Sequence, residues 1–133
     1  MTPASLRFAL LITGPCYGSQ AAADALRFAS AVLEQGHVLD SVFFYQEGVH
    51  NGSRLVQPAS DEFDVHRAWV TLAERHQLTL DLCVAAALRR GLCDDSCAAE
   101  AGLGTGNVAA PFRLSGLGAL AQAALTADRV VQF

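Results

Sequence analysis

The stretch RFALLIT, residues 7–13, decides the fold class of this sequence. Its apolar run is nearly unbroken and ends at Gly14-Pro15, which is typical of a strand buried on both faces of a sheet. A helix is expected from Gln20 to Gln35, because apolar residues recur there at three- and four-residue steps. The next stretch, Val38 to Tyr45, is rich in β-branched and aromatic residues. It completes a strand–helix–strand unit whose two strands are parallel.

The rest of the chain continues this alternation of helices and strands. The pattern predicts, in chain order, a helix at Asp64–Gln77, a strand at Thr79–Cys83, helices at Val84–Arg90, Asp94–Ala101 and Leu117–Ala127, and a strand at Arg129–Phe133. The segment Glu47–Phe63 is expected to be irregular and to serve as an interface or lid loop. These elements predict an α/β fold in one domain, residues 1–133. Its architecture is a three-layer α/β/α sandwich around a mainly parallel central sheet.

Composition and charge narrow the classes of function. Apolar residues make up 52% of the chain and charged residues 17%, so an oligomer that buries surplus apolar surface is expected. The formal charge is −4, which argues against direct nucleic acid binding because phosphate contacts need clustered cations. The N-terminal apolar run is too short for a signal peptide or a membrane helix. A cytoplasmic protein without membrane contact is therefore expected.

The four cysteines of such a protein are expected to be reduced thiols. Cys83 ends the predicted third strand and precedes Val84-Ala85-Ala86, whose backbone N–H groups are the unpaired donors of a helix start. Such donors favour the thiolate, which is the nucleophilic form of cysteine. The structural alternative is an inert Cys83, since free cysteine is among the most buried residue types. Cys16 occupies the equivalent place after the first strand and is the competing candidate.

The sequence supports binding of a nucleotide or a metal less well than it supports thiol chemistry. The turn GPCYGS, residues 14–19, has neither the GxGxxG spacing nor the GK[ST] ending of nucleotide-binding loops. Cys93 and Cys97 could chelate a metal only with two further ligands. The histidines form no close pair in the sequence: His37, His50, His66 and His76. No metal and no organic cofactor are expected.

Two further groups of residues have structural explanations. The acidic residues Asp61, Glu62 and Asp64 could form paired carboxylates, but acidic residues at a helix start are stabilised by the helix dipole. Trp69 lies at helical spacing from its apolar neighbours and is expected to belong to the core.

Five segments, taken in order along the chain, resemble the DsrE/TusD family of sulfur carriers, and its TusD branch most. They are TGPCYGSQ (Thr13–Gln20), SVFFYQEGV (Ser41–Val49), PASDEFD (Pro58–Asp64), CVAAALRRG (Cys83–Gly91) and LSGLGALAQAALTADRVVQF (Leu114–Phe133). The resemblance covers nearly the whole chain and implies a DsrE-like fold. The cysteine that carries a persulfide in this family maps onto Cys83. Cys16, Cys93 and Cys97 inherit no role from the resemblance.

The resemblance implies a sulfurtransferase that works without a cofactor. A TusA-like donor would give its outer persulfide sulfur to an exposed Cys83 thiolate, and Cys83 would pass it to a TusE-like acceptor. This relay would lead to 2-thiolation of the tRNA wobble uridine. TusB-like and TusC-like subunits would complete a heterohexamer containing two copies of each of three related subunits.

Two alternatives stay open at the level of the sequence. The chain could be a DsrE-like sulfur carrier in dissimilatory sulfur oxidation, with similar chemistry and a different donor. It could also be a structural subunit whose partner performs the chemistry, although the cysteine in CVAAALRRG favours an active subunit. Independently of this choice, the presence of Cys16, Cys93 and Cys97 leaves open an auxiliary or resolving thiol.

Overall fold

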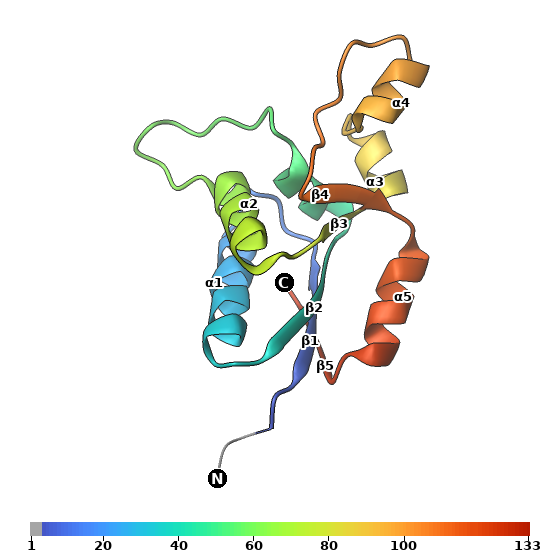
Figure 1. Cartoon of the computed structure of the whole chain (residues 1–133). Coiled ribbons are helices and arrows are strands. Elements are labelled where there is room, and N and C mark those ends of the chain that lie inside the picture. Colours follow the sequence, from blue (N-terminus) through green and yellow to red (C-terminus); the bar gives the residue numbers. More distant parts are fainter. Residues whose placement is uncertain (1–3) are drawn as a thin grey trace.

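The fold is a five-stranded sheet with helices on both faces (Figure 1). The structure, a computed structural model, describes residues 4–133. Its elements are β1 (Arg7–Ile12), α1 (Ala21–Glu34), β2 (Val38–Phe44), the 3₁₀ helix η1 (Gln46–Gly52), α2 (Val65–His76), β3 (Leu80–Cys83), α3 (Val84–Arg89), α4 (Asp95–Glu100), β4 (Phe112–Ser115), α5 (Leu117–Thr126) and β5 (Arg129–Gln132). The strand order is β4-β3-β2-β1-β5, and every neighbouring pair is parallel.

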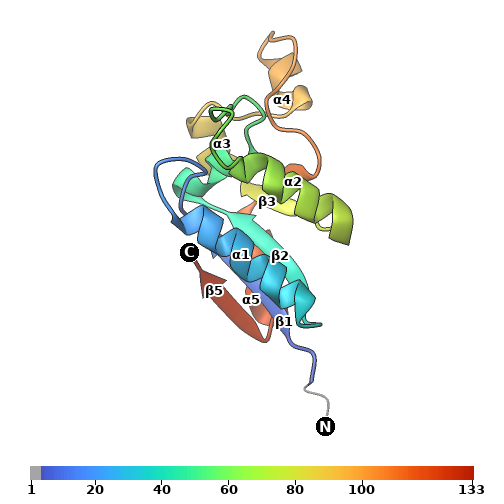
Figure 2. The same cartoon turned by 90° about the vertical axis from the view of Figure 1, so that its left-hand side faces the viewer.

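The layers follow from this topology. Helices α1 and α2 cover one face of the sheet and α5 covers the other, while α3 and α4 lie beyond its carboxyl edge (Figure 1). A view turned by a quarter shows α1 and α2 side by side in front of the strands (Figure 2). The predicted three-layer α/β/α sandwich is therefore confirmed, and its sheet is parallel throughout.

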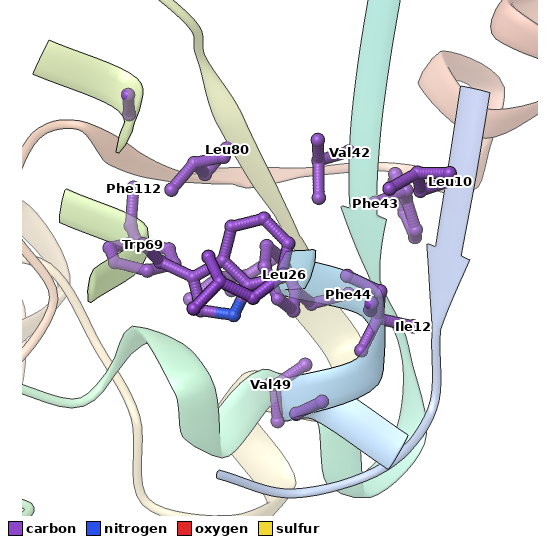
Figure 3. Close-up of a cluster of buried hydrophobic side chains, with 14 of the residues drawn as sticks. Leu10, Ile12, Leu26, Val42, Phe43, Phe44, Val49, Trp69, Leu80 and Phe112 are labelled. Atoms are coloured by element: carbon purple, nitrogen blue, oxygen red, sulfur yellow. The ribbon is translucent and has the colours of Figure 1, made fainter. Parts of the chain in front are cut away.

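The main core lies between the sheet and the layer formed by α1 and α2 (Figure 3). Trp69 of α2 is fully buried, as the sequence predicts, and its ring meets Phe44 of β2 edge-on at a centroid distance of 5.3 Å. Phe112 of β4 lies 5.7 Å from the same Phe44 ring. Aromatic pairs of this geometry add to the free energy gained by burial. They fix α2 over the middle of the sheet.

Two elements differ from the sequence prediction. Strand β4 was not predicted, and it pairs with β3 at the edge of the sheet. The segment Glu47–Phe63 was expected to be irregular throughout, but its first part belongs to η1, where Val49 and Asn51 are buried. Only the part after Gly52 is an open loop. Within residues 4–133, no helix combines the length and the apolar character needed to cross a membrane.

Candidate functional site

Cys83 lies at the carboxyl edge of the sheet. It is the last residue of β3 and the N-cap residue of α3, so its predicted position between a strand and a helix is confirmed. In a parallel sheet this edge gathers the segments that follow each strand. Here they are the loop with Cys16 after β1, η1 after β2, α3 after β3 and α5 after β4.

Cys83 is buried in the isolated chain, with 3% of its surface exposed. This differs from the exposed thiolate that sulfur exchange with another protein requires. The residue belongs to the cluster of buried hydrophobic residues, as the structural alternative expected. The sulfur atom of Cys83 is therefore closed to a second protein in this conformation of the chain.

The 3₁₀ helix η1 packs against both β3 and α3, the two elements that hold Cys83. Glu47 at its start accepts a hydrogen bond from Nε of Arg90, at the end of α3, with a distance of 2.7 Å. Nε2 of His50 lies 3.3 Å from the same carboxylate. This ion pair connects η1 to the far end of α3.

The buried Asn51 fixes η1 from the other side. Its side-chain nitrogen donates to the carbonyl oxygens of Gly14 and Gly48 at 3.0 and 2.8 Å. A Cβ atom at Gly48 would collide with the backbone of Ile12, and one at Gly52 would collide with Leu82. Glycine is required at Gly48 because the backbone of η1 lies directly on the backbone of β1 there, and Gly52 lets η1 approach the Leu82 side chain closely.

A polar cluster lies beside Cys83. Asp81, only 6% exposed, accepts hydrogen bonds at Oδ1 from Nε of Arg113 at 2.6 Å and from Oγ of Ser115 at 2.9 Å. The hydrogen-bonded carboxylate raises the pKa of Arg113. The sequence analysis missed this cluster, although an aspartate inside the apolar strand LDLC needs a partner when it is buried. We call Asp81, Arg113 and Ser115 the Asp81 cluster.

Cys16 is half-buried near η1, where its Sγ lies 3.5 Å from the carbonyl oxygen of His50. Burial is the main cause that raises the pKa of its thiol, and the negative charge of Asp64 raises it further. A raised pKa leaves less thiolate at neutral pH. The surroundings of Cys16 therefore weaken it as a nucleophile.

Cys93 and Cys97 flank the start of α4. Asp94 is the N-cap residue, and its Oδ1 accepts a hydrogen bond from the backbone N–H of Cys97 at 2.9 Å. Its carboxylate also hydrogen-bonds the Cys97 thiol and thereby raises the pKa of that group. In the part of the chain that the structure describes, no three His, Cys, Asp or Glu side chains converge on a possible metal position.

One of the acidic residues before α2, Asp64, has the structural role expected at a helix start. Asp64 is the N-cap residue of α2, and its Oδ1 accepts a hydrogen bond from the backbone N–H of Arg67 at 3.0 Å. A cavity of about 420 Å³ opens beside this helix and is lined in part by Arg54 and His66. Cys83 does not line this cavity.

The fold agrees with what sequence comparison finds. The chain belongs to the DsrE/DsrF-like family, whose family model matches residues 7–133.

One protein of similar sequence and one solved structure of similar fold add to this family assignment. The Sulfurtransferase TusD of Proteus mirabilis (strain HI4320) is 58% identical over 129 residues, which cover 97% of this chain and 99% of the relative. The crystal structure of the YchN protein from E. coli superposes with a TM-score of 0.71 at 24% identity, covering 96% of this chain and 99% of that one. At this identity the YchN comparison supports the fold alone.

Proposed function

We propose that this chain is a sulfurtransferase that carries sulfur as a persulfide on Cys83. The observation that carries the proposal is the 58% identity to Sulfurtransferase TusD along nearly the full length of both chains. The position of Cys83, where β3 passes into α3 at the carboxyl edge of the sheet, supports its choice as the carrier.

The proposed reaction is an exchange between a thiolate and a persulfide. The Cys83 thiolate attacks the outer sulfur of a donor persulfide, so that a new S–S bond forms as the donor's S–S bond breaks and the donor leaves as a thiolate. An acceptor thiolate then attacks the outer sulfur on Cys83 in the same way and regenerates the Cys83 thiolate. Neither step changes the total number of electrons in the system, so the chain needs no redox cofactor.

Cys16 and Cys97 are less suited to this reaction. The pKa values of Cys16 and Cys97 are both raised, the first chiefly by burial and the second chiefly by its hydrogen bond to Asp94. A thiol attacks through its thiolate, so a raised pKa lowers the fraction that can react at neutral pH. The raised pKa values therefore count against Cys16 and Cys97 as carriers.

Because Cys83 is buried, we propose that η1 also controls access to it. This helix packs on β3 and α3 and is connected to α3 through the Glu47–Arg90 ion pair. We expect η1 to move when a donor or acceptor docks, because a 3% exposed residue offers no approach to a second protein. Between transfers, the same cover would shield the persulfide from solvent thiols.

The assembly proposed for this chain includes TusB-like and TusC-like subunits. Helix α5 contains no charged residue, and Leu117 and Leu125 on it are 51% and 81% exposed. In the loop after η1, Leu55 and Phe63 are 70% and 66% exposed. Exposed apolar residues of this size support burial against other subunits in a heterohexamer with two copies of each of three subunits.

The proposed pathway is the cytoplasmic relay that ends in 2-thiolation of the tRNA wobble uridine. A TusA-like protein would supply the sulfur and a TusE-like protein would receive it. The negative net charge supports a role in which a partner, and not this chain, binds the RNA.

The proposal is tested by loading the chain from a purified TusA-like persulfide donor and mapping the adduct by peptide mass spectrometry. The wild type should gain one sulfur atom on the Cys83 peptide. The variant Cys83→Ser should lose this adduct, and Cys16→Ser should keep it. Loading of Cys83→Ser to the wild-type level would refute Cys83 as the carrier.

A further inference from the structure

Ser115 of the Asp81 cluster is the direct neighbour of Cys83 in the sheet. The two residues are register partners in the parallel pair formed by β3 and β4. Neighbouring strands lie about 5 Å apart, and side chains of register partners point to the same face of the sheet.

The hydrogen bonds of the Asp81 cluster identify that face. Asp81 and Cys83 are two residues apart on β3, so their side chains share one face by alternation. The hydroxyl of Ser115 reaches Asp81 at 2.9 Å, which places it on the same face. Ser115 and Cys83 therefore stand side by side on the face that α5 covers in part.

The Ser115 hydroxyl can change its acceptor at little cost. In the unloaded protein it donates its hydrogen to Oδ1 of Asp81, and Arg113 donates to the same oxygen at 2.6 Å. When the hydroxyl turns away, the buried carboxylate therefore keeps a charged partner. Arg90 is committed elsewhere, because its guanidinium donates to Glu47 and to the carbonyl oxygen of Ala86.

We propose that Ser115 binds the outer sulfur of the Cys83 persulfide, an inference that rests on the proposed function and deepens it. The outer sulfur lies about 2.0 Å beyond Sγ, a typical S–S bond length, on the face of the sheet that Cys83 shares with Ser115. The hydroxyl turns from Asp81 and donates to this anionic sulfur. A buried anion without a donor would be strongly destabilised, which explains the need for such a residue at a buried carrier.

The test compares equilibrium loading of Cys83 in Ser115→Ala and Ser115→Thr, with glutathione persulfide as the donor. Hydrogen bonds to charged groups contribute enough that Ser115→Ala should shift the exchange equilibrium about tenfold towards the donor. Ser115→Thr keeps a hydroxyl and should restore loading to near the wild-type level. Ser41→Ala, on the same face of β2, is the matched control and should load like the wild type.

A second readout separates sulfur binding from a structural role. The rate at which iodoacetamide alkylates unloaded Cys83 should stay within about twofold of the wild type in Ser115→Ala, because the hydroxyl serves Asp81 in that state. Thermal unfolding of each variant is recorded alongside. A Ser115→Ala defect that Ser115→Thr does not restore, or that accompanies a matching change in alkylation rate, would show a purely structural role and overturn the inference.

The remaining outcomes are also distinguishable. If the wild type loads Cys83 and Ser115→Ala loads it equally well, the inference about Ser115 fails while the proposed function stands. If the wild type does not load Cys83 at all, the proposed function fails and the inference fails with it.

Discussion

Cys16 and Cys83 both lie at the carboxyl edge of the sheet, Cys16 in the loop after β1 and Cys83 at the end of β3. Their surroundings differ. Cys16 faces the carbonyl oxygen of His50 and the negative charge of Asp64. Cys83 shares a face of the sheet with Ser115 and with an aspartate that is already paired to Arg113. Chemistry at this edge therefore depends on the neighbours of each thiol more than on its place after a strand.

Alkylation of Cys16 tests this difference at the residue scale. Because burial raises its pKa, the thiolate fraction at pH 7 is smaller than that of an ordinary thiol with a pKa near 8.5. Its alkylation by iodoacetamide should be slow at pH 7 and should still be accelerating above pH 9. The rate is followed on the Cys16 peptide by mass spectrometry, with the urea-unfolded chain as the control. A rate at pH 7 equal to that of the unfolded chain would contradict the expectation.

The position of Cys83 could be predicted from the sequence, and its environment could not. The apolar run before it and the small residues after it predict a strand followed by a helix, because both signals are local. Burial of Cys83 depends on the packing of the whole chain, and its pairing with Ser115 depends on the register between strands about thirty residues apart. Such contacts leave no periodic signal in one sequence.

At the scale of the elements, strand β4 could not be predicted from the sequence for a similar reason. Its four residues, FRLS, include a charged residue and are too few to form a clear pattern. The strand exists because Phe112 is buried in the core and Arg113 pairs with Asp81 on the opposite face. The longer elements β1, α1, β2 and α2 were predicted correctly, since each carries several turns or alternations of its own pattern.

The variant Glu47→Gln tests whether η1 controls access to Cys83. It removes the charged partner of Arg90 and should speed alkylation of Cys83 by less than about fivefold, since the ion pair is partly exposed. The rate is compared with that of Glu34→Gln on α1, which lies away from the site. An unchanged rate in Glu47→Gln would show that this ion pair does not limit access.

The same ion pair should respond to acid. The hydrogen bond from Arg90 is the main cause that lowers the pKa of Glu47 below its usual value near 4.3. The contact is therefore fully formed above that value and is lost as the pH falls through the lowered pKa. Wild-type Cys83, corrected for the thiolate fraction, should become more accessible only below about pH 4.3. Loss of protection already at pH 6 would assign the effect to another group.

At the scale of the whole molecule, part of the apolar surplus in the composition lies in the exposed side chains of α5. This helix lies opposite the layer formed by α1 and α2 (Figure 1). Its sequence LGALAQAALT contains no charge, and only Ala123 is buried within the chain. A helix that contributes so few buried residues to the core of its own chain is suited to pack against another subunit.

The variant Leu125→Arg tests this role of α5. Leu125 is 81% exposed, so the substitution should leave the stability of the isolated chain nearly unchanged. Co-expressed with TusB-like and TusC-like subunits, it should weaken the assembly at least tenfold, measured by native mass spectrometry. Ala31→Arg places the same charge on an exposed position of α1 and is the matched control. Full assembly of Leu125→Arg would exclude α5 from the interface.

Loading alone does not make a carrier, because a carrier must also release its sulfur. The most direct test of the account is therefore a chase in which the chain is loaded with ³⁴S-labelled persulfide, freed of donor, and mixed with a TusE-like acceptor. We predict that the label leaves the Cys83 peptide and appears on an acceptor cysteine at matching rates, and that Cys83→Ser transfers none. Label that stays on Cys83 in the presence of the acceptor, or that reaches the acceptor from Cys83→Ser, would contradict the central claim.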